Sequence, residues 1–220
     1  MDFVANIPWA EIGEASLDTL LMLGISMSFT LVLGLPLGIL LFLTGRRQLL
    51  EHMAFYNVLS FAVNILRSVP FIILLILMMP LTEIIAGTSL GVQGSIPPLV
   101  AGAAPFFARL VETALREVDR GIIEATQAMG ATTRQIVLGA LIPEALPGIA
   151  AAVTVTAIAL VSYTAMSGII GGGGLGDLAI RYGYHRHQND VMAITVILLL
   201  LLVQTLQMSG DKLVLRFTRR

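Results

Sequence analysis

Cysteine is absent from the 220-residue chain, and lysine occurs only once, as Lys212. The lack of cysteine excludes disulfide bonds and thiolate chemistry. Charge is also scarce: 12% of the residues are charged, whereas a soluble domain typically carries about 25%, and 56% are hydrophobic. This composition predicts a membrane protein. The formal net charge of −1 provides no bulk attraction for nucleic acid.

Five charge-poor runs have about the length that a helix needs to cross a bilayer. They are Thr19–Gly45, Ala54–Pro80, Pro97–Ala114, Gly148–Ile170 and Val191–Gly210. The sequence therefore predicts an all-α membrane protein with five transmembrane helices in a single domain, residues 1–220. Pro70 and Pro80 should kink or end the second helix. The Gly-, Thr- and Ser-rich stretch Thr82–Ser95 is expected to form an external loop.

The positions of the basic residues predict the orientation of the chain. With the N-terminus outside and the C-terminus inside, only Arg181 and Arg186 among the loop cations lie outside, and Arg67 lies within a span. All other basic residues are then cytoplasmic: Arg46, Arg47, Arg109, Arg116, Arg120, Arg134, Lys212, Arg216, Arg219 and Arg220. This asymmetry agrees with the positive-inside rule.

The segment from Asp119 to Pro147 is the longest polar-bearing stretch between two spans, the third and the fourth. Asp119 is a candidate N-cap for a first short helix, and Gly130 is a candidate stop. Thr132 followed by Gln135 is a capping-box pattern that opens a second helix. Pro143 is expected to end the second helix, and Pro147 can stand in the first turn of the next one. The pattern predicts a cytoplasmic docking surface built of two helices.

This segment resembles the "EAA" loop of the permease subunits of ABC importers. Glu124, Ala125, Gly130 and Pro143 stand at the family's spacing, with Ala131 directly after the glycine. The sequence departs from the pattern at Thr126, Ala140 and Ile142. Three further stretches resemble permeases of methionine importers: Asn64–Leu75, Gly102–Phe106 and Gly173–Gly176.

The resemblance implies a function and a set of partners. The chain would be the permease subunit of a binding-protein-dependent ABC importer in a bacterial inner membrane, carrying D- or L-methionine by alternating access. Its partners would be a second copy of itself, two cytoplasmic ATPase subunits and an extracytoplasmic substrate-binding protein. ATP would be used by the ATPase, and this chain would bind no cofactor. Glu124, Ala125, Gly130, Ala131 and Pro143 are the expected ATPase-coupling residues.

Five residues in or beside the spans are candidates for lining the substrate path: Arg67, Ser162, Tyr163, Met166 and Ser167. An arginine at membrane depth is costly and is usually paired or functional. The fourth span is rich in Ala, Gly, Ser and Thr, which favour close helix packing in lipid. Pairing with a carbonyl or snorkelling to the interface would also account for Arg67, and packing alone would account for the other four. Gly34 and Gly38, four residues apart, would similarly allow another helix to approach closely.

Other function classes find little support. The glycine run from Gly171 to Gly174 lacks the Gly-Lys-Ser/Thr ending of a phosphate-binding loop, and a backbone bend explains it better. His52, His185 and His187 are expected in loops, without the spacing of a helical metal site. The end of the third helix, with Arg109, Glu112 and Arg116, is expected to project beyond the membrane, where Glu112 and Arg116 are spaced for a helix pair. No acidic residue is then expected inside the membrane, which disfavours both an intramembrane enzyme and an ion-driven carrier. A permease for another small polar solute, or a passive channel or scaffold, remain as alternatives.

Overall fold

The computed structural model describes residues 8–218, and every regular element in this part of the chain is helical. Four helices are long and apolar enough to cross a membrane: α1 (Trp9–Thr44), α4 (Gly91–Arg116), the helical run Thr133–Ile170, and α9 (Asn189–Thr218). A fifth span results if the bent pair α2 (Met53–Ser68) and α3 (Phe71–Ala86) is counted as one. The all-helical membrane fold is thus confirmed, with four or five candidate spans.

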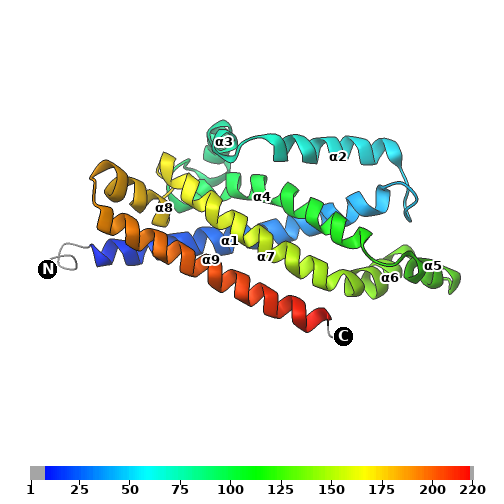
Figure 1. Cartoon of the computed structure of the whole chain (residues 1–220). Coiled ribbons are helices and arrows are strands. Elements are labelled where there is room, and N and C mark those ends of the chain that lie inside the picture. Colours follow the sequence, from blue (N-terminus) through cyan, green and yellow to red (C-terminus); the bar gives the residue numbers. More distant parts are fainter. Residues whose placement is uncertain (1–7, 219–220) are drawn as a thin grey trace. The chain divides into compact units, whose positions relative to one another are not determined.

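The second predicted span is not one continuous helix. Helix α2 ends at Ser68 and α3 starts at Phe71, with Val69 and Pro70 between them (Figure 1). Pro70 is the N-cap of α3, as expected of a residue that cannot continue a helix. Pro80 instead lies inside α3, and α4 already begins at Gly91, so helix replaces most of the expected loop Thr82–Ser95.

Pro143 does not end a helix, which corrects the sequence prediction. Helix α6 (Thr133–Ile136) continues through a π-helical turn, Val137–Leu141, directly into α7 (Ile142–Ser167). The Ile142 N–H donates to the Val137 carbonyl five residues back. This widened turn lies just ahead of Pro143, whose ring would otherwise clash with the carbonyl four residues before it. Pro147 likewise lies inside α7 rather than in its first turn.

The chain divides into two compact units, and the long helices contribute to both. The first unit contains residues 8–29, 69–103 and 157–207 of the described chain. Its core includes Met22, Leu99 and Leu160, which are fully buried. The rings of Phe71 and Tyr163 stack with centroids 4.3 Å apart. The remaining elements here are a 3₁₀ turn (Gly168–Ile170), α8 (Gly174–Leu178) and a π-helical turn (Ala179–His185).

The glycine run in the first unit forms a tight turn, as predicted. Gly171, Gly173 and Gly174 adopt positive φ angles of 83°, 79° and 77°, which favour glycine. A Cβ atom at Gly172 would lie 2.7 Å from the carbonyl oxygen of Ser167. The run therefore permits close backbone approach.

The second unit contains residues 30–68, 104–156 and 208–218 of the described chain. Gly34 and Gly38 of α1 lie directly against α4, as the sequence suggested. A Cβ atom at Gly38 would lie 2.5 Å from the carbonyl oxygen of Ala108, and one at Gly34 would lie 2.9 Å from that of Ala104. Only glycine allows α1 and α4 to come this close.

Candidate functional site

The segment between α4 and α7 forms two capped helices, as the sequence predicted. In α5 (Arg120–Ala128) the Asp119 carboxylate accepts a hydrogen bond from the Gly121 N–H at 2.6 Å. Gly130 follows this helix with a φ of 79°, which is the usual glycine stop. At the start of α6 the Thr132 N–H donates to Gln135 Oε1 at 2.8 Å, and the Gln135 N–H donates back to the Thr132 hydroxyl, forming a capping box.

The inner face of this segment belongs to the core of the second unit. Ile123 of α5 and Ile136 of α6 are buried in the same apolar cluster as Phe42 of α1 and Leu115 of α4. Leu141 of the π-helical turn also lies in this cluster. Because one cluster joins the segment to the ends of two candidate spans, we infer that the segment moves with these helix ends as one body.

The outer face of α5 has little structural use within this chain. Glu124, Ala125, Ala128 and Met129 are all exposed, and Met129 is 78% exposed. Glu124 forms an ion pair with Arg120 at 3.1 Å, with both side chains more than 60% exposed. Such exposed pairs contribute little stability. A carboxylate, small side chains and a flexible thioether are therefore exposed on one short helix and the residue that follows it.

The five predicted coupling residues occupy different environments. Glu124, Ala125 and Gly130 are exposed on or beside α5. Ala131 is half-buried and packs against the core cluster. Pro143 is exposed in the first turn of α7, beyond the π-helical turn. The exposed residues of this set thus lie on α5, in the turn that follows it and at Pro143.

A cavity of about 390 Å³ lies behind α5. Its apolar walls are Phe42, Leu49, Leu115, Val118 and Ile123. Its polar walls are Arg47, Gln48, Arg116, Arg120, Glu124 and Gln127. These residues come from the turn after α1, the end of α4, and α5.

A buried ionic network surrounds Glu112 on α4; the sequence predicted its pair with Arg116, which is confirmed, but not the burial or the other partners. Glu112 is 2% exposed and forms ion pairs at 2.6 Å with both Arg109 and Arg116. The Tyr56 hydroxyl of α2 lies 3.1 Å from the same carboxylate. Arg109 also donates to the Ser60 hydroxyl at 2.7 Å. Glu112 therefore lies inside a candidate span, contrary to the expectation that no span holds an acidic residue. Its spacing to Arg109 and Arg116, three and four residues away, was a visible signal.

The candidate path residues do not form one cluster. Ser162 and Met166 are exposed on one face of α7, four residues apart. Tyr163 packs on Phe71, and Ser167 is fully buried, donating to the Thr164 carbonyl at 2.7 Å. These contacts assign packing roles to Tyr163 and Ser167 within this chain.

Arg67, the fifth candidate, is an exposed residue near the end of α2. Its guanidinium lies 5.7 Å from the ring centroid of Phe106, within cation–π range.

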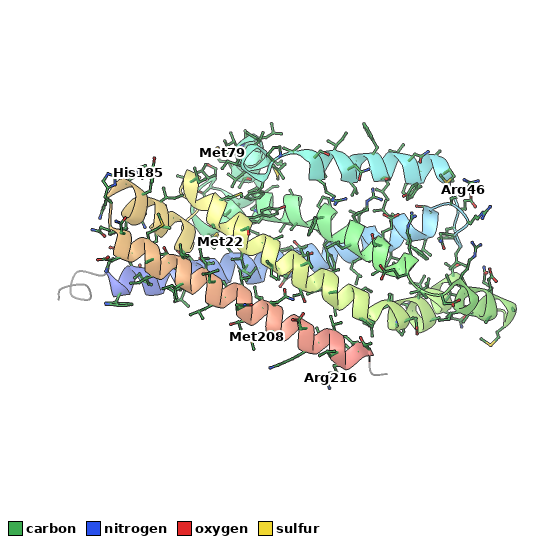
Figure 2. The ribbon with its side chains drawn as sticks, viewed as in Figure 1. Met22, Arg46, Met79, His185, Met208 and Arg216 are labelled. Atoms are coloured by element: carbon green, nitrogen blue, oxygen red, sulfur yellow. The ribbon has the colours of Figure 1, made fainter. Side chains whose placement is uncertain are left out.

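The histidines lie at helix boundaries or in turns. His52 precedes α2, and His185, labelled in Figure 2, ends the π-helical turn before α9. No group of three or more histidine, cysteine or acidic side chains in residues 8–218 is arranged to hold a metal ion.

Comparisons with known proteins agree on one type of protein. A family model described as "Binding-protein-dependent transport system inner membrane component" matches residues 34–219. The probable D-methionine transport system permease protein MetI of Vibrio cholerae is 50% identical over 206 residues, covering 94% of this chain and 92% of the relative. The methionine import system permease protein MetP of Bacillus subtilis is 46% identical over 209 residues, covering 95% and 94%.

Two solved structures of ABC transporters are similar to this chain. A chain from inward-facing conformations of the MetNI methionine ABC transporter aligns with a TM-score of 0.94 at 47% identity, covering 95% of this chain and 97% of that one. A chain of an amino acid ABC transporter solved with histidines aligns with a TM-score of 0.79 at 16% identity, covering 98% and 99%. The second likeness shows the fold alone.

Proposed function

The chain belongs to the family of binding-protein-dependent transport system inner membrane components, and from that premise we propose that it is the permease subunit of an ATP-driven methionine importer. It is a multi-pass protein of the inner membrane, and residues 1–220 act as one permease domain. The methionine assignment follows the MetI and MetP relatives. Either or both stereoisomers of methionine are the cargo.

The mechanism rests on one observation: the docking segment formed by α5 and α6 has an exposed outer face and a buried inner face. Its outer face, α5 with the turn at Gly130, is free of contacts needed by this chain, whereas Ile123 and Ile136 anchor its inner face beside the ends of α1 and α4. A partner that seats on Glu124 and Ala125 would therefore move these helix ends with it. A passive channel or a scaffold has no use for such an element.

The partners follow from the same premise. We assign the N-terminus to the outside and the C-terminus to the inside, so that α5 and α6 are cytoplasmic, in line with the positive-inside rule. Two copies of the chain would enclose the path, since symmetric dimers are the commonest oligomers. Two cytoplasmic ATPase subunits would hydrolyse ATP, and an extracytoplasmic binding protein would deliver the amino acid. This chain would supply neither an ATPase site nor a cofactor.

The path would be opened and closed by alternating access. ATP binding draws the ATPase subunits together, and the anchored α5–α6 segment carries this motion to α1 and α4. Ser162 and Met166 form the exposed face of α7 that can meet the substrate or the second copy. Arg67 would act near the path through its exposed guanidinium. Tyr163 and Ser167 would shape the path from behind.

The test is uptake of labelled D- and L-methionine by vesicles that hold the chain together with its ATPase subunit, supplied with the binding protein. Ala125→Phe adds bulk to the exposed face of α5 and should abolish ATP-dependent uptake without changing the amount of folded chain. Ala54→Phe, an equal change at an exposed alanine of α2, is the matched control and should retain uptake.

Three results would each contradict part of the proposal. Uptake that continues without ATP would indicate a channel. Uptake unaffected by Ala125→Phe would remove α5 from the coupling role. Active transport of a different solute would keep the importer class and overturn the methionine assignment.

A further inference from the structure

The cavity behind α5 has an unbalanced positive charge. Three arginines, Arg47, Arg116 and Arg120, face one glutamate, Glu124, across its walls. Glu124 pairs with Arg120 at 3.1 Å, whereas the single carboxylate of Glu112 is shared by Arg116 and Arg109, each at 2.6 Å. These pairings leave positive charge over at the cavity, including the whole charge of Arg47.

Arg47 is held in place but not neutralised. Its backbone N–H donates to Glu51 Oε2 at 3.0 Å, and Glu51 does not line the cavity. In the part of the chain that the structure describes, the guanidinium of Arg47 makes no hydrogen bond or ion pair with protein. The backbone of Arg47 has a φ of 60°, an uncommon conformation for a side chain of this kind. Arg47 is exposed and lines the cavity, so its guanidinium is available to an anionic occupant.

The cavity lies where two candidate spans end. Arg47 follows the end of α1 at Thr44 by three residues, and Arg116 is the last residue of α4. Lipid headgroups occupy the zone immediately beyond the hydrocarbon core. Basic pockets between membrane helices on the cytoplasmic side are suited to anionic lipid headgroups. The apolar walls, Phe42 and Leu115 among them, suit the less polar part of such a molecule.

We propose that this cavity binds a phosphate-bearing anion, and that the source is the headgroup of an anionic phospholipid. A phosphodiester carries a negative charge that the guanidinium of Arg47 can meet. With a cavity of about 390 Å³ and roughly 30 Å³ for each water in the liquid, the space holds a phosphate group together with part of its glycerol. A lipid seated here would join the turn after α1 to α5, and so would brace the docking segment. The inference goes beyond the transported substrate and does not depend on it.

The experiment is native mass spectrometry of the full chain, with any co-purified ATPase subunit, released from detergent after titration with phosphatidylglycerol or phosphatidylcholine. The wild-type chain should bind one phosphatidylglycerol per copy more tightly than phosphatidylcholine. Arg47→Asn removes the charge while keeping a residue that tolerates positive φ, so the fold should be retained. The affinity of this variant for phosphatidylglycerol should be roughly fivefold lower than that of the wild type, which is the contribution expected of one basic residue near an anionic membrane surface. Its affinity for phosphatidylcholine should not change.

The matched control is Arg46→Asn. Arg46, labelled in Figure 2, stands next to Arg47 in the same turn and is exposed, but it does not line the cavity. It should leave the affinity for the first phosphatidylglycerol unchanged, whereas a general surface-charge effect would weaken binding equally in both variants and overturn the site.

Two further results would redirect the assignment. If excess inorganic phosphate binds in an Arg47-dependent way and no lipid preference is seen, the anion chemistry stands and the lipid source is wrong. If Arg47→Asn instead loosens the ATPase subunit and leaves lipid binding unaltered, a carboxylate of that partner is the occupant and the proposal fails.

Discussion

Replacing Gly38 by alanine tests the close approach of α1 to α4. The added Cβ would lie 2.5 Å from the Ala108 carbonyl oxygen and 2.7 Å from the Cβ of Val111. The first neighbour is backbone, and Ala108 and Val111 are fully buried, so neither can move aside without shifting the helix. Overpacking of this kind typically costs about 1–3 kcal/mol.

The higher helix propensity of alanine stabilises the Gly38→Ala variant and so opposes the cost of the contact. A control variant is needed to measure this gain separately. Alanine is favoured over glycine inside a helix by about 1 kcal/mol. Gly24, in the same helix, has no atom within 4 Å of the position that a Cβ would take. Gly24→Ala therefore reports the propensity gain alone, and Gly13→Ala, which is equally open, repeats the control. The difference between Gly38→Ala and Gly24→Ala isolates the cost of the contact.

The assay is thermal unfolding of the purified full chain in mild detergent, and the readout is the loss of the monodisperse species as the temperature rises. For a chain of this size, 1 kcal/mol shifts the melting temperature by about 2–4 °C. We expect Gly38→Ala to melt roughly 2–12 °C below Gly24→Ala. Equal melting temperatures for the two variants would refute the tight packing of α1 on α4.

Three further predictions concern Glu112, Asp119 and Gly130. Glu112→Ala should lower the free energy of unfolding by about 3 kcal/mol, because Arg109 is left largely buried without its partner. Arg116→Gln, at a half-exposed position, should lower it by under about 1 kcal/mol. Similar losses for the two variants in a denaturation series would contradict a network centred on Glu112. Asp119→Ala should cost about 1 kcal/mol of helix stability, seen as faster amide hydrogen exchange confined to α5, and uniform exchange across the chain would count against a local cap. Gly130→Val should lower the stability of the chain by about 1–2 kcal/mol because the φ of this residue is positive, and Gly130→Asn should lower it less. The space around Gly130 is open, so backbone strain is the only expected cost. Equal losses for the two variants in thermal melting would indicate a steric cause instead.

Much of the molecule could be predicted from local patterns in the sequence. Hydrophobic runs define candidate spans because a helix must satisfy its own backbone hydrogen bonds in lipid. The caps at Asp119 and Thr132 and the stop at Gly130 formed as expected, since each depends on side chains and backbone within a few residues. The family pattern from Glu124 to Pro143 was equally visible, because spacing is a property of the sequence.

Only the tertiary structure decided how these pieces are used. Pro143 stays inside a helical run because a π-helical turn ahead of it widens the backbone, and nothing within a few residues requires that turn. Glu112 is buried because α2 brings Tyr56 against it while Arg109 and Arg116 supply the charge. Burial and pairing of this kind depend on which helices meet, and those contacts join residues far apart in the chain. The sequence alone determined the apolar helical runs and the caps of α5 and α6, whereas packing determined which helices meet and where the helical run through Pro143 continues.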